Sequence, residues 1–114
     1  MSSLTTDLYS AVIAEVENDS FSMYLVKKDF QKFDLYINSN LEVFNFSFYD
    51  IVEFLFKYSK NLLIKNQTFQ LSLMINNDLT YNAFFNNESK QVNVDQDSVL
   101  RYILHIFQCA KLKI

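Results

Sequence analysis

The sequence contains no glycine, no proline and no tryptophan. Without glycine, the Rossmann fingerprint, the Walker A loop and the nucleophile elbow of serine hydrolases are excluded, because each needs glycine at fixed positions. The sequence also lacks an apolar run near the roughly 18 residues that a membrane-spanning helix requires, and its first residues do not resemble a signal peptide. We therefore expect a cytoplasmic protein with no membrane partner.

Cysteine and positive charge are scarce as well. The single Cys109 cannot form an internal disulfide, which favours a reducing compartment. There are 10 Lys and Arg against 13 Asp and Glu, giving a net charge of -3 at pH 7, and the lysines look scattered along the chain. A nucleic-acid-binding domain usually carries a clustered basic patch. We therefore expect no nucleic-acid partner.

What the sequence does contain is apolar and aromatic side chains. Half of its 114 residues are hydrophobic, including 12 Phe and 7 Tyr, a composition that favours a folded chain over a disordered one. The length fits a single domain over residues 1–114. We see no internal repeat, linker or low-complexity segment. The absent glycines leave turns to Asn, as in Asn38-Ser39-Asn40, since Asn tolerates left-handed backbone angles.

Hydrophobic periodicity predicts the element order α-β-β-β-α-β-β-α. The spacing of Leu4, Leu8, Val12 and Val16 predicts a first helix over about residues 4–17. Alternating residues predict strands over about 21–26, 33–37, 41–48, 69–75 and 79–85, and helical spacing predicts helices from Asp50 to about residue 63 and from about Asp97 to 110. Residues 86–97 are predicted to be a loop. Strands grouped between helices indicate an α+β fold, with a mostly antiparallel sheet packed against helices.

The chemistry-bearing residues do not indicate an enzyme. His105 and Cys109 lie four residues apart on a predicted helix, but no third group is placed to complete a catalytic site, and structural zinc needs four ligands. The carboxylates fall at helix ends and in turns, where capping explains them. We therefore expect no catalytic residue, no metal and no cofactor.

Apolar side chains exceed what one buried face requires. Tyr24 and Val26 alternate with Phe21, Met23 and Leu25 in the predicted first strand, so both faces of the sheet carry apolar groups. Soluble monomers rarely expose large contiguous apolar patches. The helix that begins near Asp50 is also apolar over more than one face, which means either that it lies deep in the core or that it forms a dimer interface. We therefore expect a protein partner.

The order of the elements, the length and the acidic charge together resemble the class I chaperones of type III secretion. The resemblance is best from Leu71 to Leu79 and from Val92 through Tyr102 to Phe107, which are similar to that family's closing strand, polar loop and helix. It implies a cytoplasmic homodimer with a role in virulence, which holds the N-terminal segment of a secreted effector in extended form, without nucleotide or metal.

The resemblance also implies two sets of site residues. The dimer interface is expected at Ile51, Leu55, Phe56 and Leu62. The effector is expected to bind in apolar grooves formed by Leu8, Val12, Phe21, Met23, Phe33, Leu35 and Phe44. The alternative is an immunity protein, a small acidic α+β domain that blocks the active site of a bacterial toxin. A chaperone should dimerise and bind an unfolded segment, whereas an immunity protein can be monomeric and binds a folded toxin through acidic residues.

Overall fold

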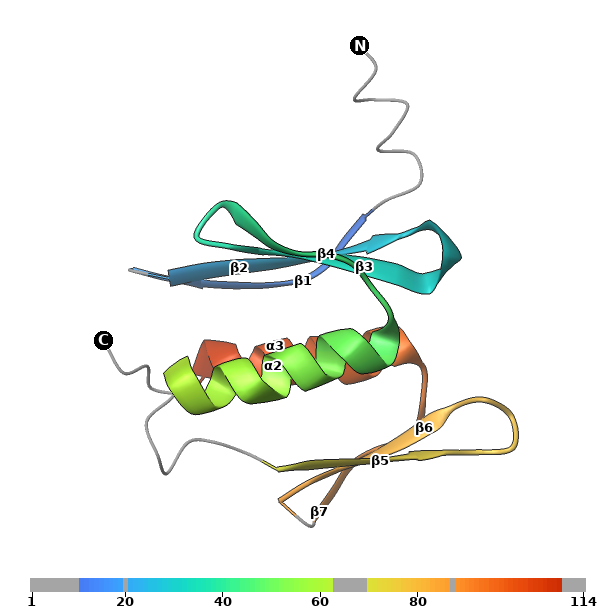
Figure 1. The fold of residues 1–114 in the computed structure, drawn as a ribbon. Helices are drawn as coiled ribbons and strands as arrows, with labels where there is room; N and C mark the ends of the chain where they lie inside the picture. The colour runs from blue at the N-terminus through green and yellow to red at the C-terminus, as the bar shows by residue number, and fades with distance from the viewer. Residues whose placement is uncertain (1–10, 20, 63–69, 87, 110–114) are drawn as a thin grey trace. The chain divides into compact units, whose positions relative to one another are not determined.

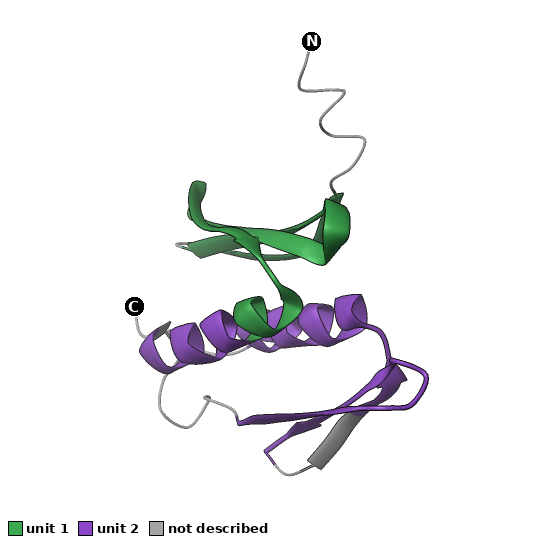
Figure 2. Ribbon diagram, turned by 45° about the vertical axis from the view of Figure 1, so that its right-hand side comes forward, with its two compact units in different colours: residues 1–52 green, residues 53–114 purple. Residues whose placement is uncertain are grey.

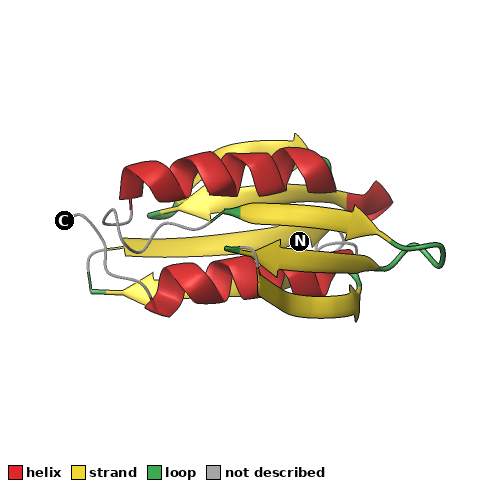
Figure 3. Cartoon of the chain, turned by 90° about the horizontal axis from the view of Figure 1, so that it is seen from below, coloured by secondary structure: helices red, strands yellow, loops and turns green. Residues whose placement is uncertain are grey.

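The computed structural model describes residues 11–19, 21–62, 70–86 and 88–109 (Figure 1). In chain order the elements are β1 (Ala11–Asn18), β2 (Phe21–Lys28), a 3-10 turn η1 (Asp29–Gln31), β3 (Lys32–Ile37), β4 (Asn40–Phe46), α2 (Phe48–Leu62), β5 (Leu71–Ile75), β6 (Tyr81–Phe85), β7 (Glu88–Val94) and α3 (Gln96–Cys109). The first four strands form one antiparallel sheet in the order β1-β2-β3-β4, and the last three form another in the order β5-β6-β7. Figure 3 shows the same strands and helices by type.

The chain divides into two compact units, residues 1–52 and 53–114, with the boundary inside α2 (Figure 2). In the first unit, one face of the four-stranded sheet carries a continuous set of buried side chains, namely Val16, Phe21, Met23, Leu25, Phe33, Leu35, Ile37 and Val43. In the second unit, Tyr102 of α3 packs on Phe85 of β6 with ring centroids 4.7 Å apart. Compact units are not in themselves independent domains, so the single domain over residues 1–114 stays a prediction.

The α+β class and the mostly antiparallel pairing are confirmed, as are the two later helices and all five predicted strands, but the strands form two sheets where one was expected. The helix expected over residues 4–17 is wrong for residues 11–18, which form β1, while residues 4–10 lie outside the described part of the chain. Val16 faces the core and Glu15 and Glu17 do not, which is the period of two of a strand. A bulge between Val12 and Ala14 interrupts this alternation, so Val12, which pairs with Val26, lies on the opposite face from Val16, which pairs with Met23.

The loop expected over residues 86–97 is also wrong, because residues 88–94 form β7. The pairing of β6 with β7 shifts register twice, between Tyr81 and Ala83 and between Ala83 and Phe84. Each bulge adds a residue to the strand and breaks its alternation. In a segment with few apolar residues, the strand pattern is then lost from the sequence.

The structure contains an internal repeat that the sequence analysis missed. Every strand pairing in the second sheet equals a pairing in the first with 48 added to both residue numbers, so that Leu25↔Leu35 corresponds to Leu73↔Ala83 and Leu35↔Val43 to Ala83↔Gln91. The two register shifts of β3 with β4 recur at the same places between β6 and β7. The segments β2-β3-β4-α2 and β5-β6-β7-α3 are therefore two copies of one βββα motif.

Side-chain hydrogen bonds repeat along with the backbone. Asn38 N–H donates to Ser22 O and Ser22 N–H donates to Asn38 Oδ1, both at 2.9 Å, and Asn86 forms the same pair of bonds with Gln70 at the same distances. At the bulge before each helix, Asn45 N–H donates to Asp34 Oδ1 and Asn93 N–H donates to Asn82 Oδ1, again at 2.9 Å. The repeat is thus preserved in its polar contacts as well as its strands.

The two helices begin in the same way. The Ser47 hydroxyl accepts the N–H of Asp50 at 3.3 Å before α2, and the Asp95 carboxylate accepts the N–H of Ser98 at 2.8 Å before α3. Ser and Asp are both favoured as helix N-caps. Between residues 22–61 and 70–109, only Leu25/Leu73, Asn38/Asn86 and Asn45/Asn93 are identical. Such low identity explains why the repeat is not visible in the sequence.

Candidate protein-binding face

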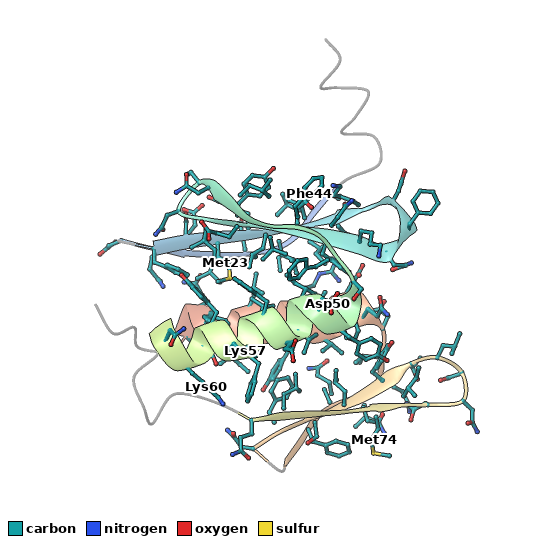
Figure 4. The ribbon with its side chains drawn as sticks, viewed as in Figure 1. Met23, Phe44, Asp50, Lys57, Lys60 and Met74 are labelled. Carbon is teal, nitrogen blue, oxygen red and sulfur yellow. The ribbon has the colours of Figure 1, made fainter. Side chains whose placement is uncertain are left out.

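The residues expected to bind an effector do not lie on one surface. Phe21, Met23, Phe33 and Leu35 are at most 5% exposed and share the buried face of the first sheet. Phe44 is 61% exposed, and it lies on the opposite side of that sheet from Met23 (Figure 4). Four of the expected residues therefore offer no surface to a partner of the folded chain.

Val12 is the other expected binding residue that is open to solvent, with 56% of its surface exposed. Its partner across the strands is Val26, which is half-buried, and the next partner is Asp34, which is buried but polar. Leu8 lies outside the described residues. Val12 and Phe44 thus mark a second, exposed face of the four-stranded sheet.

The expected dimer interface on α2 is covered in part by the chain itself. Ile51 and Leu55 are fully buried and Phe56 is half-buried, with Lys60 Nζ 4.6 Å from its ring centroid. Leu62 ends the helix, and its side chain lies outside the described part. Ile51 and Leu55 therefore present no surface to a second copy, and the homodimer stays a prediction.

The outer face of the first sheet is assembled by its register. Glu15 pairs with Tyr24, Tyr24 with Tyr36, and Tyr36 with Leu41, so one row crosses all four strands. We use the name outer face for these residues together with Val12, Glu17, Val26, Lys28, Asp34 and Phe44. Aromatic and aliphatic side chains dominate this face, and β-branched and aromatic pairs across strands also stabilise the sheet.

A lysine is seated at one end of the outer face. Lys28 Nζ lies 4.0 Å above the centroid of the Phe44 ring and 3.4 Å from each carboxylate oxygen of Asp34. The negative face of the ring and the carboxylate both attract the ammonium group. The Asp34 side chain is only 10% exposed and also accepts Asn45 N–H, so this contact is anchored to the backbone.

A tyrosine and a carboxylate meet at the other end. The Tyr24 hydroxyl donates a 2.5 Å hydrogen bond to Glu17 Oε1. This bond, assisted by desolvation and by the negative charges of Glu17 and Glu15, raises the pKa of Tyr24 above its ordinary value of 10.0. Tyr24 is therefore held neutral next to two carboxylates.

Charge is divided unevenly along the chain. Residues 1–52 contain eight acidic and three basic residues, a net charge of -5, whereas residues 53–114 contain five acidic and seven basic residues, a net charge of +2. The three basic residues of the first part are Lys27, Lys28 and Lys32, at the hairpin between β2 and β3. The expectation of scattered lysines is therefore wrong for this part. The cross-strand partner of Lys28 is Lys32, so on this side of the sheet two lysines accompany the carboxylates of Glu15, Glu17 and Asp34.

The second repeat shows what the same positions hold elsewhere in the fold. Tyr24, Leu41 and Phe44 correspond to Ser72, Ser89 and Val92. Lys28 and Asp34 correspond to Asn76 and Asn82, whose amides are joined by a 3.1 Å hydrogen bond. Tyr36 corresponds to Phe84, so an aromatic ring is kept at that position. The βββα motif therefore forms without the rings of Tyr24 and Phe44 and without the charges of Lys28 and Asp34.

The described residues that could carry catalysis or bind a metal are few. His105 and Cys109 are exposed on α3, with Cys109 Sγ 3.6 Å from His105 Nε2, and the Tyr102 ring centroid lies 6.4 Å from that of His105. Over the described ranges, no three His, Cys, Asp or Glu side chains lie together as metal ligands do. Within those ranges, neither α2 nor α3 is long and apolar enough to cross a membrane. The absence of enzyme activity and of cofactors stays a prediction.

Comparisons of the chain with protein-family models, with curated proteins and with solved structures give no match. The description of the outer face therefore depends on the sequence and structure of this chain, without support from a relative. In the sequence, Tyr24 and Val26 alternate with Phe21, Met23 and Leu25, and this pattern predicts that they face away from the core. Periodicity separates the two faces of a strand, but it does not say which of them the rest of the chain covers.

Proposed function

We propose that this chain is a non-catalytic protein-binding domain whose outer face covers a basic surface on a folded partner, as an immunity protein covers a toxin. The observation that carries this proposal is an exposed aromatic and aliphatic sheet face, including Phe44 at 61% exposed, on a part of the chain with net charge -5. Complementary charge steers such encounters, and aromatic side chains supply much of the binding energy at interfaces.

The construction of the face supports this function. Antiparallel pairing holds the row of Tyr24, Tyr36 and Leu41 at a fixed spacing, so little conformational entropy is lost on binding a rigid partner. Tyr and Phe have few rotatable bonds and large contact areas, which suits them to this role. Such a face needs no conformational change to bind.

The second candidate is the effector chaperone implied by the family resemblance, with its homodimer and its role in virulence. Val12 and Phe44 are exposed, as an effector-binding surface requires. However, the resemblance depends on an N-terminal helix where residues 11–18 form β1, and four of the expected groove residues are buried. These observations favour the immunity function over the chaperone function.

The two functions are separated by co-expressing the chain with the product of each neighbouring gene, since an inhibitor and its target must be made in the same cell. We expect a soluble complex with one folded, basic product, weakened by salt, in which the activity of that product is blocked. Phe44→Val should weaken the complex at least fivefold, and Val92→Phe, at the equivalent position of the second repeat, should leave it unchanged.

Two results contradict the proposal. One is that neither neighbouring product binds. The other is that a product binds only through an extended N-terminal segment, and binds equally well after its folded domain is removed. The second result supports the chaperone function.

A further inference from the structure

Four strands lie at the edges of the two sheets, namely β1, β4, β5 and β7. Three of them contain charged residues, which are Glu15 and Glu17 in β1, Glu42 in β4, and Glu88 and Lys90 in β7. The same three strands pair with their neighbours through register shifts. Charges and bulges at an edge prevent one sheet from pairing with another. The five residues of β5 are uncharged and pair with β6 in unbroken register, so among the described strands β5 is the edge that lacks this protection.

In the first repeat, the equivalent edge is covered by another strand. β5 corresponds to residues 23–27 of β2, and β1 pairs with β2 along that side. No strand of the described residues does so for β5. Each residue of β5 is more exposed than its equivalent in β2: Leu25 is fully buried and Leu73 is half-buried, while Met74 and Ile75 are 55% and 56% exposed. The fold thus accepts an antiparallel strand at this position, and the described chain supplies one only to the first sheet.

The hydrogen bonds at the two ends of β5 show which of its backbone groups face the uncovered edge. Asn86 N–H donates to Gln70 O at 2.9 Å, and Asn76 N–H donates to Thr80 O at 2.8 Å. Gln70 and Asn76 therefore face β6, and so do the even-numbered residues between them, because successive residues of a strand direct their N–H and C=O groups to opposite sides. The odd-numbered residues direct theirs to the uncovered edge. These are Leu71, Leu73 and Ile75.

We propose that β5 pairs antiparallel with β5 of a second copy of this chain, which joins two β5-β6-β7 sheets into one. In the register that pairs all five residues, Leu73 lies opposite Leu73, Leu71 opposite Ile75, and Ser72 opposite Met74. A two-fold axis at Leu73 then relates the copies, as in most homodimers. This interface differs from the α2 interface that the family resemblance implies. It does not involve the outer face, so it stands apart from the proposed function.

The side chains of β5 are self-complementary in this register. Leu71, Leu73 and Ile75 pair with buried residues of β6, so they lie on the inner face of the second sheet. Met74 points away from that face (Figure 4). Each apolar side chain on the inner face of one copy therefore meets an apolar side chain of the other, as the inner residues of β1 and β2 do in the first sheet.

The backbone fits the same register. The odd-numbered residues of both copies face each other and form about six N–H···O=C hydrogen bonds, two for each pair. A strand with charged residues on its inner face fits less well, because those charges would lose water without gaining a partner. The pair is short, so we expect a dimer that dissociates on dilution.

Light scattering of the full chain over a range of concentrations tests for this dimer. We expect a mass near two chains of 13.5 kDa each at about 1 mM, falling to one chain at about 1 µM. Ile75→Lys should raise the dissociation constant about tenfold, since it places an ammonium group opposite Leu71 of the other copy. Lys27 occupies the equivalent position of β2, so the strand tolerates this side chain.

Val92→Lys on β7 is the matched control. Val92 is 55% exposed against 56% for Ile75, and the two substitutions change the charge equally. Because β7 lies outside the proposed interface, Val92→Lys should leave the dissociation constant unchanged.

Cross-linking tests the register. In chains with Cys109→Ser, which removes the native thiol, Ser72→Cys and Met74→Cys place thiols at exposed positions of β5. Opposite residues of a non-hydrogen-bonded pair have Cα atoms about 4.5 Å apart, within the range of a disulfide. A mixture of the two variants in a glutathione redox buffer should therefore form disulfide-linked dimers. Each variant alone should not, because its thiols are two residues out of register.

Three results would overturn the inference. One is the mass of a single chain at every concentration. Another is a dimer that Ile75→Lys and Val92→Lys weaken equally, which places the interface elsewhere. The third is a yield of cross-linked dimer that is no higher in the mixture than in either variant alone, and this test remains decisive if Ile75→Lys does not fold.

Discussion

At the scale of single residues, asparagine occupies half of the described positions at which the backbone adopts the positive φ that favours glycine. Eight described residues have positive φ, and four of them are Asn38, Asn45, Asn86 and Asn93. The turn expected at Asn38-Ser39-Asn40 is confirmed, with φ of 50° and 71° at its first two residues. Phe30 and Leu79 also have positive φ while 90% and 75% exposed, at an expected cost of about 1–2 kcal/mol each. Neither the backbone conformation nor core packing explains why large apolar side chains occupy these two exposed positions.

Tyr24 leads to a prediction about pH. The hydrogen bond to Glu17 raises its pKa, so the bond contributes to stability below pH 10 and is lost as the pH rises through the folded-state pKa. Glu17→Ala should return the pKa of Tyr24 toward 10.0, as followed by NMR of ring-labelled tyrosine. Glu15→Ala should lower it less, because the Glu15 charge is the smallest of the causes. Equal effects of the two changes would show that charge, and not the hydrogen bond, controls this group.

At the scale of elements, sequence periodicity predicts the strands that apolar residues mark and misses those where a bulge coincides with few or irregularly spaced apolar residues. β2, β3, β5 and β6 are predicted from their alternation. β4 is predicted as well, although its pairing with β3 shifts register twice, because Val43, Phe44 and Phe46 mark it. β1 and β7 also pair with register shifts, and the sequence pattern misses both. The internal repeat is not visible in the sequence because the features that its two copies share most closely are hydrogen bonds of asparagine side chains. These asparagines do not contribute to hydrophobic periodicity.

The repeat predicts matched losses of stability in its two copies. Asn38→Ala and Asn86→Ala each remove an acceptor for a backbone N–H and place alanine at positive φ, so each should cost about 2 kcal/mol of unfolding free energy. Glycine at either position should cost only about 1 kcal/mol, since it relieves the backbone strain and loses only the side-chain hydrogen bond. Urea unfolding measures both. A loss in one copy alone would show that the two asparagines do not have equivalent roles.

At the scale of the whole molecule, the sequence indicated a surplus of apolar surface but misplaced it. The family resemblance implies an interface that includes Ile51 and Leu55, both of which the structure buries, and grooves of which Phe21, Met23, Phe33 and Leu35 are in the core while Val12 and Phe44 are exposed. Alternation reveals that a strand has two apolar faces, and helical spacing reveals a wide apolar stripe. Which of these apolar surfaces remains exposed to solvent depends on tertiary packing. A local sequence pattern does not contain that information.

Leu55 distinguishes a buried α2 from a dimerising one. Because Leu55 is fully buried, Leu55→Glu places an unpaired charge in the core and should cost about 3–5 kcal/mol, enough to unfold a domain of marginal stability. Circular dichroism should then show loss of structure.

Glu53→Ala is the control on the exposed side of the same helix. The ion pair of Glu53 with Lys57 is 3.9 Å long and open to solvent, so this change should leave both the fold and the mass unchanged. Light scattering measures the mass against 13.5 kDa per chain. A Leu55→Glu chain that stays folded while its mass falls from two chains to one would instead place the dimer interface on α2, as a chaperone requires.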